Sequence, residues 1–113
     1  MYIESVKIHE QFGSTRPSHF YCGDAIKIQA ILNIDTADSV TLKVVDPCLA
    51  KKVDWTTVSK KVNGVYEYIF QSHESGWMEG DYIVTIKVNY NGYTDVIQDM
   101  ITLHWQEPFG TVV

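Results

Sequence analysis

The stretch Gly80-Asp81-Tyr82-Ile83-Val84-Thr85-Ile86-Lys87-Val88-Asn89-Tyr90 decides the fold class, because its apolar residues recur at every second position. The residues between them are mostly polar, with Ile83 as the exception. The alternating apolar positions are Tyr82, Val84, Ile86, Val88 and Tyr90. Since successive side chains of a strand point to opposite faces, this pattern predicts a strand with one buried face.

Similar patterns on both sides of this stretch predict six more strands. The expected strands cover residues 2–10, 24–34, 39–45, 51–62, 65–71 and 93–105. The alternation slips near Ser5, as at a β-bulge, and the segment 51–62 fits either one strand or two. Asn63-Gly64 and Asn91-Gly92 are strong hairpin signals. About seven short strands with regular turns predict an all-β antiparallel sandwich with Greek-key connections, and a small closed barrel is the alternative.

The residues that lead into the 80–90 strand carry a family resemblance. Gly80-Asp81-Tyr82 resembles the tyrosine corner of immunoglobulin-like β-sandwiches, in which the phenol bonds the backbone near the turn. With the preceding Trp77-Met78-Glu79 and the Asn91-Gly92 turn, it makes the chain similar to the immunoglobulin-like domains of prokaryotic surface proteins and tailed-virus virions. The resemblance implies one such domain over residues 1–105, with 106–113 as a C-terminal tail or linker. It carries no activity, and the chain departs from the antibody type because the 39–45 strand has no Trp.

Length, charge and hydropathy narrow the class of partner. A chain of 113 residues suits one domain. Its net charge of -5 disfavours nucleic acid and anionic membrane surfaces. No apolar run approaches the roughly 18 residues of a spanning helix, so we expect no membrane insertion. Residues 2–8 alternate like a strand and do not resemble a signal peptide. We therefore expect either a natural start at Met1 without Sec export, or a Met added to an excised domain.

Strand succession predicts where the histidines and cysteines gather. If neighbouring strands run antiparallel, the two chain ends lie at opposite poles of the sandwich, and all His and Cys residues lie near the C-terminal pole. One interpretation is solvated imidazoles with free thiols. Another is a Cys22–Cys48 disulfide, which implies an oxidising compartment. The third is a tetrahedral zinc site, whose ligands would be His19, Cys22, Cys48 and His73.

The remaining aromatic and basic residues have structural and functional interpretations. Trp77 is expected to cover the end of the core beside Tyr82. Trp55 and Trp105 would serve either as stacking platforms for sugars or as packing under loops and in a protein interface. Four lysines surround the uncertain strand, which favours a sheet edge, because edge lysines deter edge-to-edge pairing. They are Lys51, Lys52, Lys60 and Lys61.

Function is predicted mainly by elimination. The sequence has no Gly-x-Ser-x-Gly elbow, Gly-rich phosphate loop or His-Glu-x-x-His motif, so we expect no enzyme, catalytic residue or cofactor. The first hypothesis is a structural or adhesion module of a virion, either capsid-decorating or tail-associated, with protein partners. The alternatives are a spacer or adhesin domain of a secreted or surface-layer protein, and a carbohydrate-binding module. The expected location is a virion or the cell surface, with cytoplasmic assembly compatible with the missing signal peptide.

Overall fold

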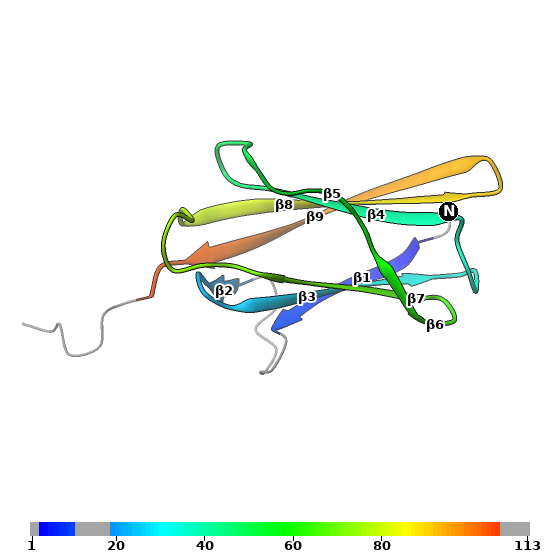
Figure 1. The fold of residues 1–113 in the computed structure, drawn as a ribbon, viewed down its shortest axis with the longest axis horizontal. Coiled ribbons are helices and arrows are strands. Elements are labelled where there is room, and N and C mark those ends of the chain that lie inside the picture. Colours follow the sequence, from blue (N-terminus) through cyan, green and yellow to red (C-terminus); the bar gives the residue numbers. More distant parts are fainter. Residues whose placement is uncertain (1–2, 11–18, 107–113) are drawn as a thin grey trace, which may run out of the picture.

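The computed structural model describes residues 3–10 and 19–106, and within 3–10 it describes the side chain of Val6 alone. This part of the chain forms strands in two packed sheets (Figure 1). The strands are β1 Ile3–Glu10, β2 His19–Tyr21, β3 Ala25–Leu32, β4 Ser39–Val45, β5 Lys51–Thr57, β6 Ser59–Val62, β7 Val65–Gln71, β8 Gly80–Tyr90 and β9 Tyr93–His104. Each predicted segment contains a strand, which confirms the all-β sandwich and excludes the closed barrel. Within the described residues, no helix has the length and apolar character to cross a bilayer.

The strand order is that of an immunoglobulin-like sandwich. One sheet, here called the β8 sheet, has the order β2-β9-β8-β4-β5, and the other, the β3 sheet, has the order β1-β3-β7-β6. Neighbouring strands pair antiparallel except β2 and β9, which run parallel. The first strand of the fold is thus divided, with β1 in one sheet and β2 in the other. The expected bulge near Ser5 is present as a register shift in the β1–β3 pair.

The core lies between the sheets and is built from the inward face of each strand. Burial alternates strictly along β3 and β4, as their sequences predict. The central β8 contributes four buried apolar residues to the core, Tyr82, Val84, Ile86 and Val88, and the largest of them, Tyr82, has no exposed surface. Each fully buried large apolar side chain contributes about 1.5–3 kcal/mol. The alternating residues of 80–90 therefore decide the fold, because they form the part of the core that the central strand of the β8 sheet contributes.

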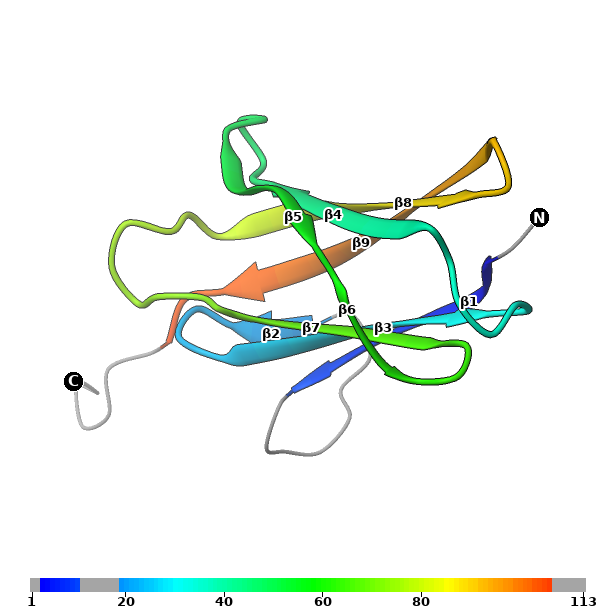
Figure 2. The ribbon, with the colours of Figure 1, turned by 45° about the vertical axis from the view of Figure 1, so that its right-hand side comes forward.

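Two elements differ from the pattern-based expectation. β2 lies in a segment that reads as a loop, because a strand of three residues is too short to show a period. Its central Phe20 is fully buried and pairs with Leu103. The segment 51–62 forms two strands that are edges of different sheets (Figure 2). The crossing is at Val58, whose side chain is buried and whose N–H donates to the Val40 carbonyl over 2.8 Å. The predicted edge position of this lysine-rich segment is confirmed.

The two ends of the described chain, the start of β1 and the end of β9, lie at opposite poles of an elongated body (Figure 1). Ile3 pairs with Leu32, whose N–H donates to the Gly64 carbonyl, and we call this end the entry pole. β9 ends at His104, whose carbonyl accepts from the Cys22 N–H over 2.8 Å, and we call that end the exit pole. The principal extents are 59 × 28 × 17 Å. This opposition agrees with the strand directions inferred from the sequence.

Candidate functional site

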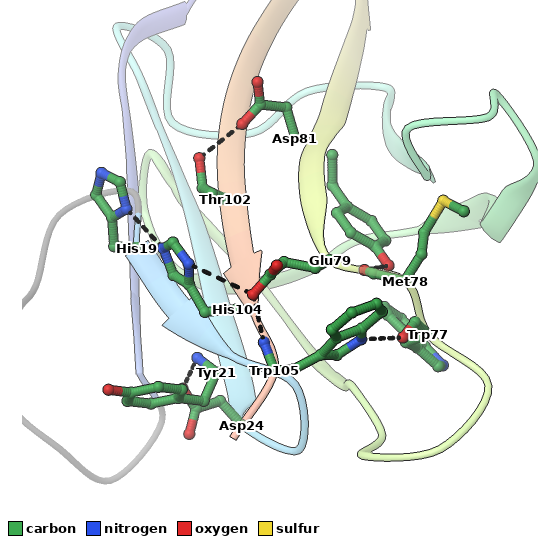
Figure 3. Close-up of polar contacts among 11 residues, drawn as sticks. His19, Tyr21, Asp24, Trp77, Met78, Glu79, Asp81, Thr102, His104 and Trp105 are labelled. Atoms are coloured by element: carbon green, nitrogen blue, oxygen red, sulfur yellow. Dashed lines mark hydrogen bonds and ion pairs between the residues drawn. The ribbon is translucent and has the colours of Figure 1, made fainter. Parts of the chain in front are cut away.

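A network of polar contacts lies at the exit pole. It forms where the parallel β2 and β9 end beside the loop that leads into β8 (Figure 3). The hydroxyl of the fully buried Ser72 closes the β2–β3 turn: it accepts from the Gly23 N–H over 2.9 Å and donates to the Asp24 carbonyl over 2.8 Å. This turn sets the position of β2 against β9.

A chain of two imidazoles and one carboxylate lies on the outer side of this pole. His19 Nδ1 is 3.1 Å from His104 Nε2, and the two rings stack with centroids 5.4 Å apart. His104 Nδ1 is 3.9 Å from Glu79 Oε2 (Figure 3). One nitrogen of the His–His contact must carry the proton that the other accepts. When His104 Nε2 is the acceptor, the neutral ring carries its proton on Nδ1, which faces Glu79. Ion pairs at this exposure contribute little.

The segment after β9 is fixed to the exit pole by three hydrogen bonds. The Trp105 N–H donates to Glu79 Oε2 over 3.0 Å, and its indole Nε1–H donates to the Trp77 carbonyl over 3.1 Å (Figure 3). The Gln106 side-chain amide donates to the Cys22 carbonyl over 2.8 Å. The Glu79 carboxylate thus lies near His104 and accepts the hydrogen bond from the Trp105 N–H. The arrangement fixes Trp105 and Gln106, the last described residues, against the exit pole.

Trp77 covers the end of the core beneath this network, as its position in the sequence predicts. Its ring stacks between Tyr82, at 5.6 Å and 15°, and Phe70, at 6.2 Å and 14°. The Tyr82 hydroxyl donates to the Met78 carbonyl over 2.6 Å, which is the bond that the tyrosine-corner resemblance implies. Desolvation in the core raises the pKa of Tyr82 to about 12. The corner is therefore a structural feature that stays protonated at neutral pH.

The cysteines and the other predicted metal ligands are not brought together. Cys22 is buried and Cys48 is exposed, and both are free thiols, so the Cys22–Cys48 disulfide is not formed. Burial raises the pKa of the Cys22 thiol, and the nearby Glu79 raises it further. His19 contacts His104, while His73 lies against Trp77 with centroids 6.1 Å apart. Among the described residues, no group of His, Cys, Asp and Glu has the geometry to hold a metal ion.

The two remaining tryptophans lie far apart in the sheet order. Trp55 is on the edge strand β5, on the outer face of the β8 sheet, and is 39% exposed. Two ammonium groups lie over its ring: Lys87 Nζ is 4.4 Å and Lys43 Nζ 4.9 Å from the centroid. Trp105 follows β9, with β8 and β4 between it and β5, and is 56% exposed. They do not form a shared stacking platform.

Sequence reasoning misses the partners of these residues. Glu79 lies inside the quoted Trp77–Tyr82 motif, but its role depends on the position of β9, which no local pattern gives. The His19–His104 contact depends on the parallel β2, which is too short to show a pattern. Lys43 and Lys87 alternate with buried residues on β4 and β8, so their outward direction is predictable. Their meeting at Trp55 depends on the strand order.

These features define an all-β two-sheet sandwich with an elaborated exit pole. No protein-family model and no curated protein matches the chain. Among solved structures, it is similar to part of the endo-β-1,4-mannanase from Thermotoga petrophila, with a TM-score of 0.55 and 10% sequence identity. The match covers 92% of this chain and 21% of that chain, so this chain spans about a fifth of the structure that it matches. At this identity the likeness shows the fold alone.

Proposed function

We propose that the chain is a non-enzymatic structural module that holds two parts of a larger polypeptide or assembly at a fixed spacing. The observation that carries this proposal is that the start of β1 and the end of β9 lie at opposite ends of the long axis of the body (Figure 1). An element inserted between two neighbours separates them only if the chain enters and leaves at opposite ends. The sandwich has this property, and its rigid core keeps the separation constant.

The exit pole supports the same proposal. The Trp105 and Gln106 bonds fix the last described residues to Glu79, Trp77 and Cys22. A domain joined directly after Gln106 would have its orientation fixed relative to the sandwich. A flexible linker in place of Trp105 and Gln106 would not fix that orientation, because each unrestrained residue can adopt many backbone conformations.

The structural comparison is compatible with a place inside a longer chain. The same fold makes up about a fifth of the matched mannanase. That enzyme's activity is not carried over, since the likeness concerns the fold. The resemblance of the Trp77–Tyr82 motif favours a virion, as a capsid-decorating or tail-associated protein, and a spacer or adhesin of a surface protein is the second candidate.

A replacement experiment tests the connecting role. In the native polypeptide or particle, the module is exchanged for an unrelated rigid sandwich whose ends have the same separation and direction. A second exchange uses a flexible linker of equal contour length. The proposal predicts that the rigid replacement keeps assembly and the linker does not. Loss of assembly with both replacements would contradict a pure connecting role, and mass spectrometry of purified particles and of the exported fraction separates the virion from the surface protein.

A further inference from the structure

The outer face of the β8 sheet presents an aromatic ring with two cations. Trp55 comes from β5, Lys43 from β4 and Lys87 from β8, so three adjacent strands supply the group. Both ammonium groups lie within 5 Å of one ring centroid. The β4–β8 register, in which Thr41 pairs with Lys87 and Lys43 with Thr85, places the two lysines diagonally on the same face. Their proximity is therefore built into the sheet.

The two ammonium groups form no ion pair within the described residues, although the charge of Lys43 also acts on the Asp54 carboxylate. Asp54 is the neighbour of Trp55 in the sequence. Its carboxylate lies 3.3 Å from Lys51 Nζ and accepts a 2.8 Å hydrogen bond from the Trp55 N–H. Within the described residues, neither Lys43 nor Lys87 has a carboxylate at ion-pair distance. Two like charges beside one ring repel each other. An anion placed between the two ammonium groups would remove this repulsion.

The surrounding surface suits a sugar. Trp55 is exposed on a broad sheet face, and an indole stacks well against the C–H side of a flat ring. The side-chain amide of the exposed Gln98 donates to Thr85 Oγ1 over 3.1 Å. Thr85 pairs with Gln98 on one side and with Lys43 on the other, so the three residues lie in one row across the sheet. The side-chain carbonyl of Gln98 is an acceptor for a hydroxyl group. An acidic peptide would use the ammonium groups equally well, but it offers no ring with a matching C–H face.

We propose that Trp55, Lys43 and Lys87 bind an acidic saccharide of the uronate class. The carboxylate of the sugar draws the ammonium groups away from the indole, because charge-assisted hydrogen bonds are stronger than cation–π contacts at an exposed site. The freed indole face then stacks on the sugar ring. The aromatic ring thus holds both lysines near their binding position while the site is empty. This activity goes beyond the connecting role and would let the module attach to an acidic glycan.

Isothermal titration calorimetry of the intact chain tests the site with three probes: a galacturonate trimer, its methyl ester and hexaglutamate. The proposal predicts binding of the trimer and at least about tenfold weaker binding of both other probes. Trp55→Ala and the double variant Lys43→Met with Lys87→Met should each weaken trimer binding by at least about tenfold. Lys52→Met is the matched control, because it removes the ammonium that lies 5.4 Å from the Trp77 ring and leaves Trp55 intact.

Each other outcome overturns the proposal. Undetectable trimer binding, or unchanged binding in the Trp55 and lysine variants, removes the site. Equal affinity for hexaglutamate assigns it to acidic peptides, and equal affinity for the methyl ester removes the role of the ammonium groups. If Trp55→Ala fails to fold, Trp55→Phe serves instead, with a smaller loss that must still exceed that of Lys52→Met. None of these failures affects the replacement experiment, so the two proposals are tested separately.

Discussion

The Tyr82 hydroxyl donates a 2.6 Å hydrogen bond to the Met78 carbonyl, four residues earlier in the chain. Because Tyr82 is fully buried at the exit-pole end of the core, this bond joins the loop before β8 to the core. The same loop carries Trp77 and Glu79, which hold Trp105. The corner thus connects the core to the exit pole.

Truncation of Tyr82 tests the corner. Tyr82→Ala should lower the free energy of unfolding by about 3–5 kcal/mol, as other buried aromatic truncations do. Tyr82→Phe keeps the ring and should cost about 1–3 kcal/mol, because the Met78 carbonyl loses its donor in a partly buried place. Lys60→Glu, at an exposed edge position, is the control and should change stability by no more than about 0.5 kcal/mol. Urea denaturation midpoints measure all three, and an unchanged midpoint for Tyr82→Phe would mean that the bond is unimportant.

The raised pKa of Tyr82 predicts a stability loss at high pH. In the unfolded chain the phenol has its ordinary pKa of 10.0, and in the folded chain desolvation raises the pKa to about 12. The folded state therefore holds this proton more tightly, and its contribution to stability is fully present below pH 10. That contribution is lost as the pH rises from 10 to 12, by up to about 1.4 kcal/mol for each pH unit in this range. The stability difference between the unmodified chain and Tyr82→Phe should shrink over the same range in urea titrations, while a constant difference would contradict the raised pKa.

Gly80 is a position where a side chain is poorly tolerated. Its φ is +137°, and an added Cβ would lie 2.8 Å from Pro47 Cγ. Gly76 has a φ of +84° but nothing within 4 Å of such a Cβ. Gly80→Ala should therefore cost about 2 kcal/mol or more, against about 1 kcal/mol for the matched Gly76→Ala. Thermal unfolding of both variants measures the difference. Equal losses would show that the contact with Pro47 does not matter.

The two thiols should differ in reactivity. Cys48 is exposed and Cys22 is buried, with a raised pKa that keeps it protonated. A thiol reagent at neutral pH should label Cys48 promptly and Cys22 only on unfolding, because the thiolate is the reactive form. Mass spectrometry without reductant counts the labels on the native and the denatured chain. A mass that fits a closed disulfide, or labels on both residues of the native chain, would contradict this assignment.

The sequence predicts the strands well because period-two alternation reports which face is buried. It predicts the edge segment 51–62 but not where it divides, since the crossing at Val58 is fixed by the distant Val40 carbonyl. It fails for β2, where Phe20 is the one inward residue of a short strand. The prediction that residues 106–113 form a tail lies, except for Gln106, outside the described residues.

The candidate sites are less predictable because they combine residues from several strands. Strand direction predicts the correct pole for the His and Cys residues, but direction alone cannot say which side chains meet. His19 meets His104, and Glu79 meets Trp105, through the parallel β2–β9 pair and the β8 loop. Residue type alone makes Trp55 a candidate for ligand binding. The proximity of Lys43 and Lys87 to its ring depends on the strand order β5-β4-β8, which the sequence does not show.

The central claim is that the sandwich holds its two ends apart in a fixed direction. Small-angle X-ray scattering tests it on a chain with one compact reference domain fused directly before Ile3 and another directly after Gln106. We predict a pair-distance distribution with a separate maximum at or beyond the 59 Å length of the body. Reference domains that lie side by side, or a broad distribution without that maximum, would contradict the account.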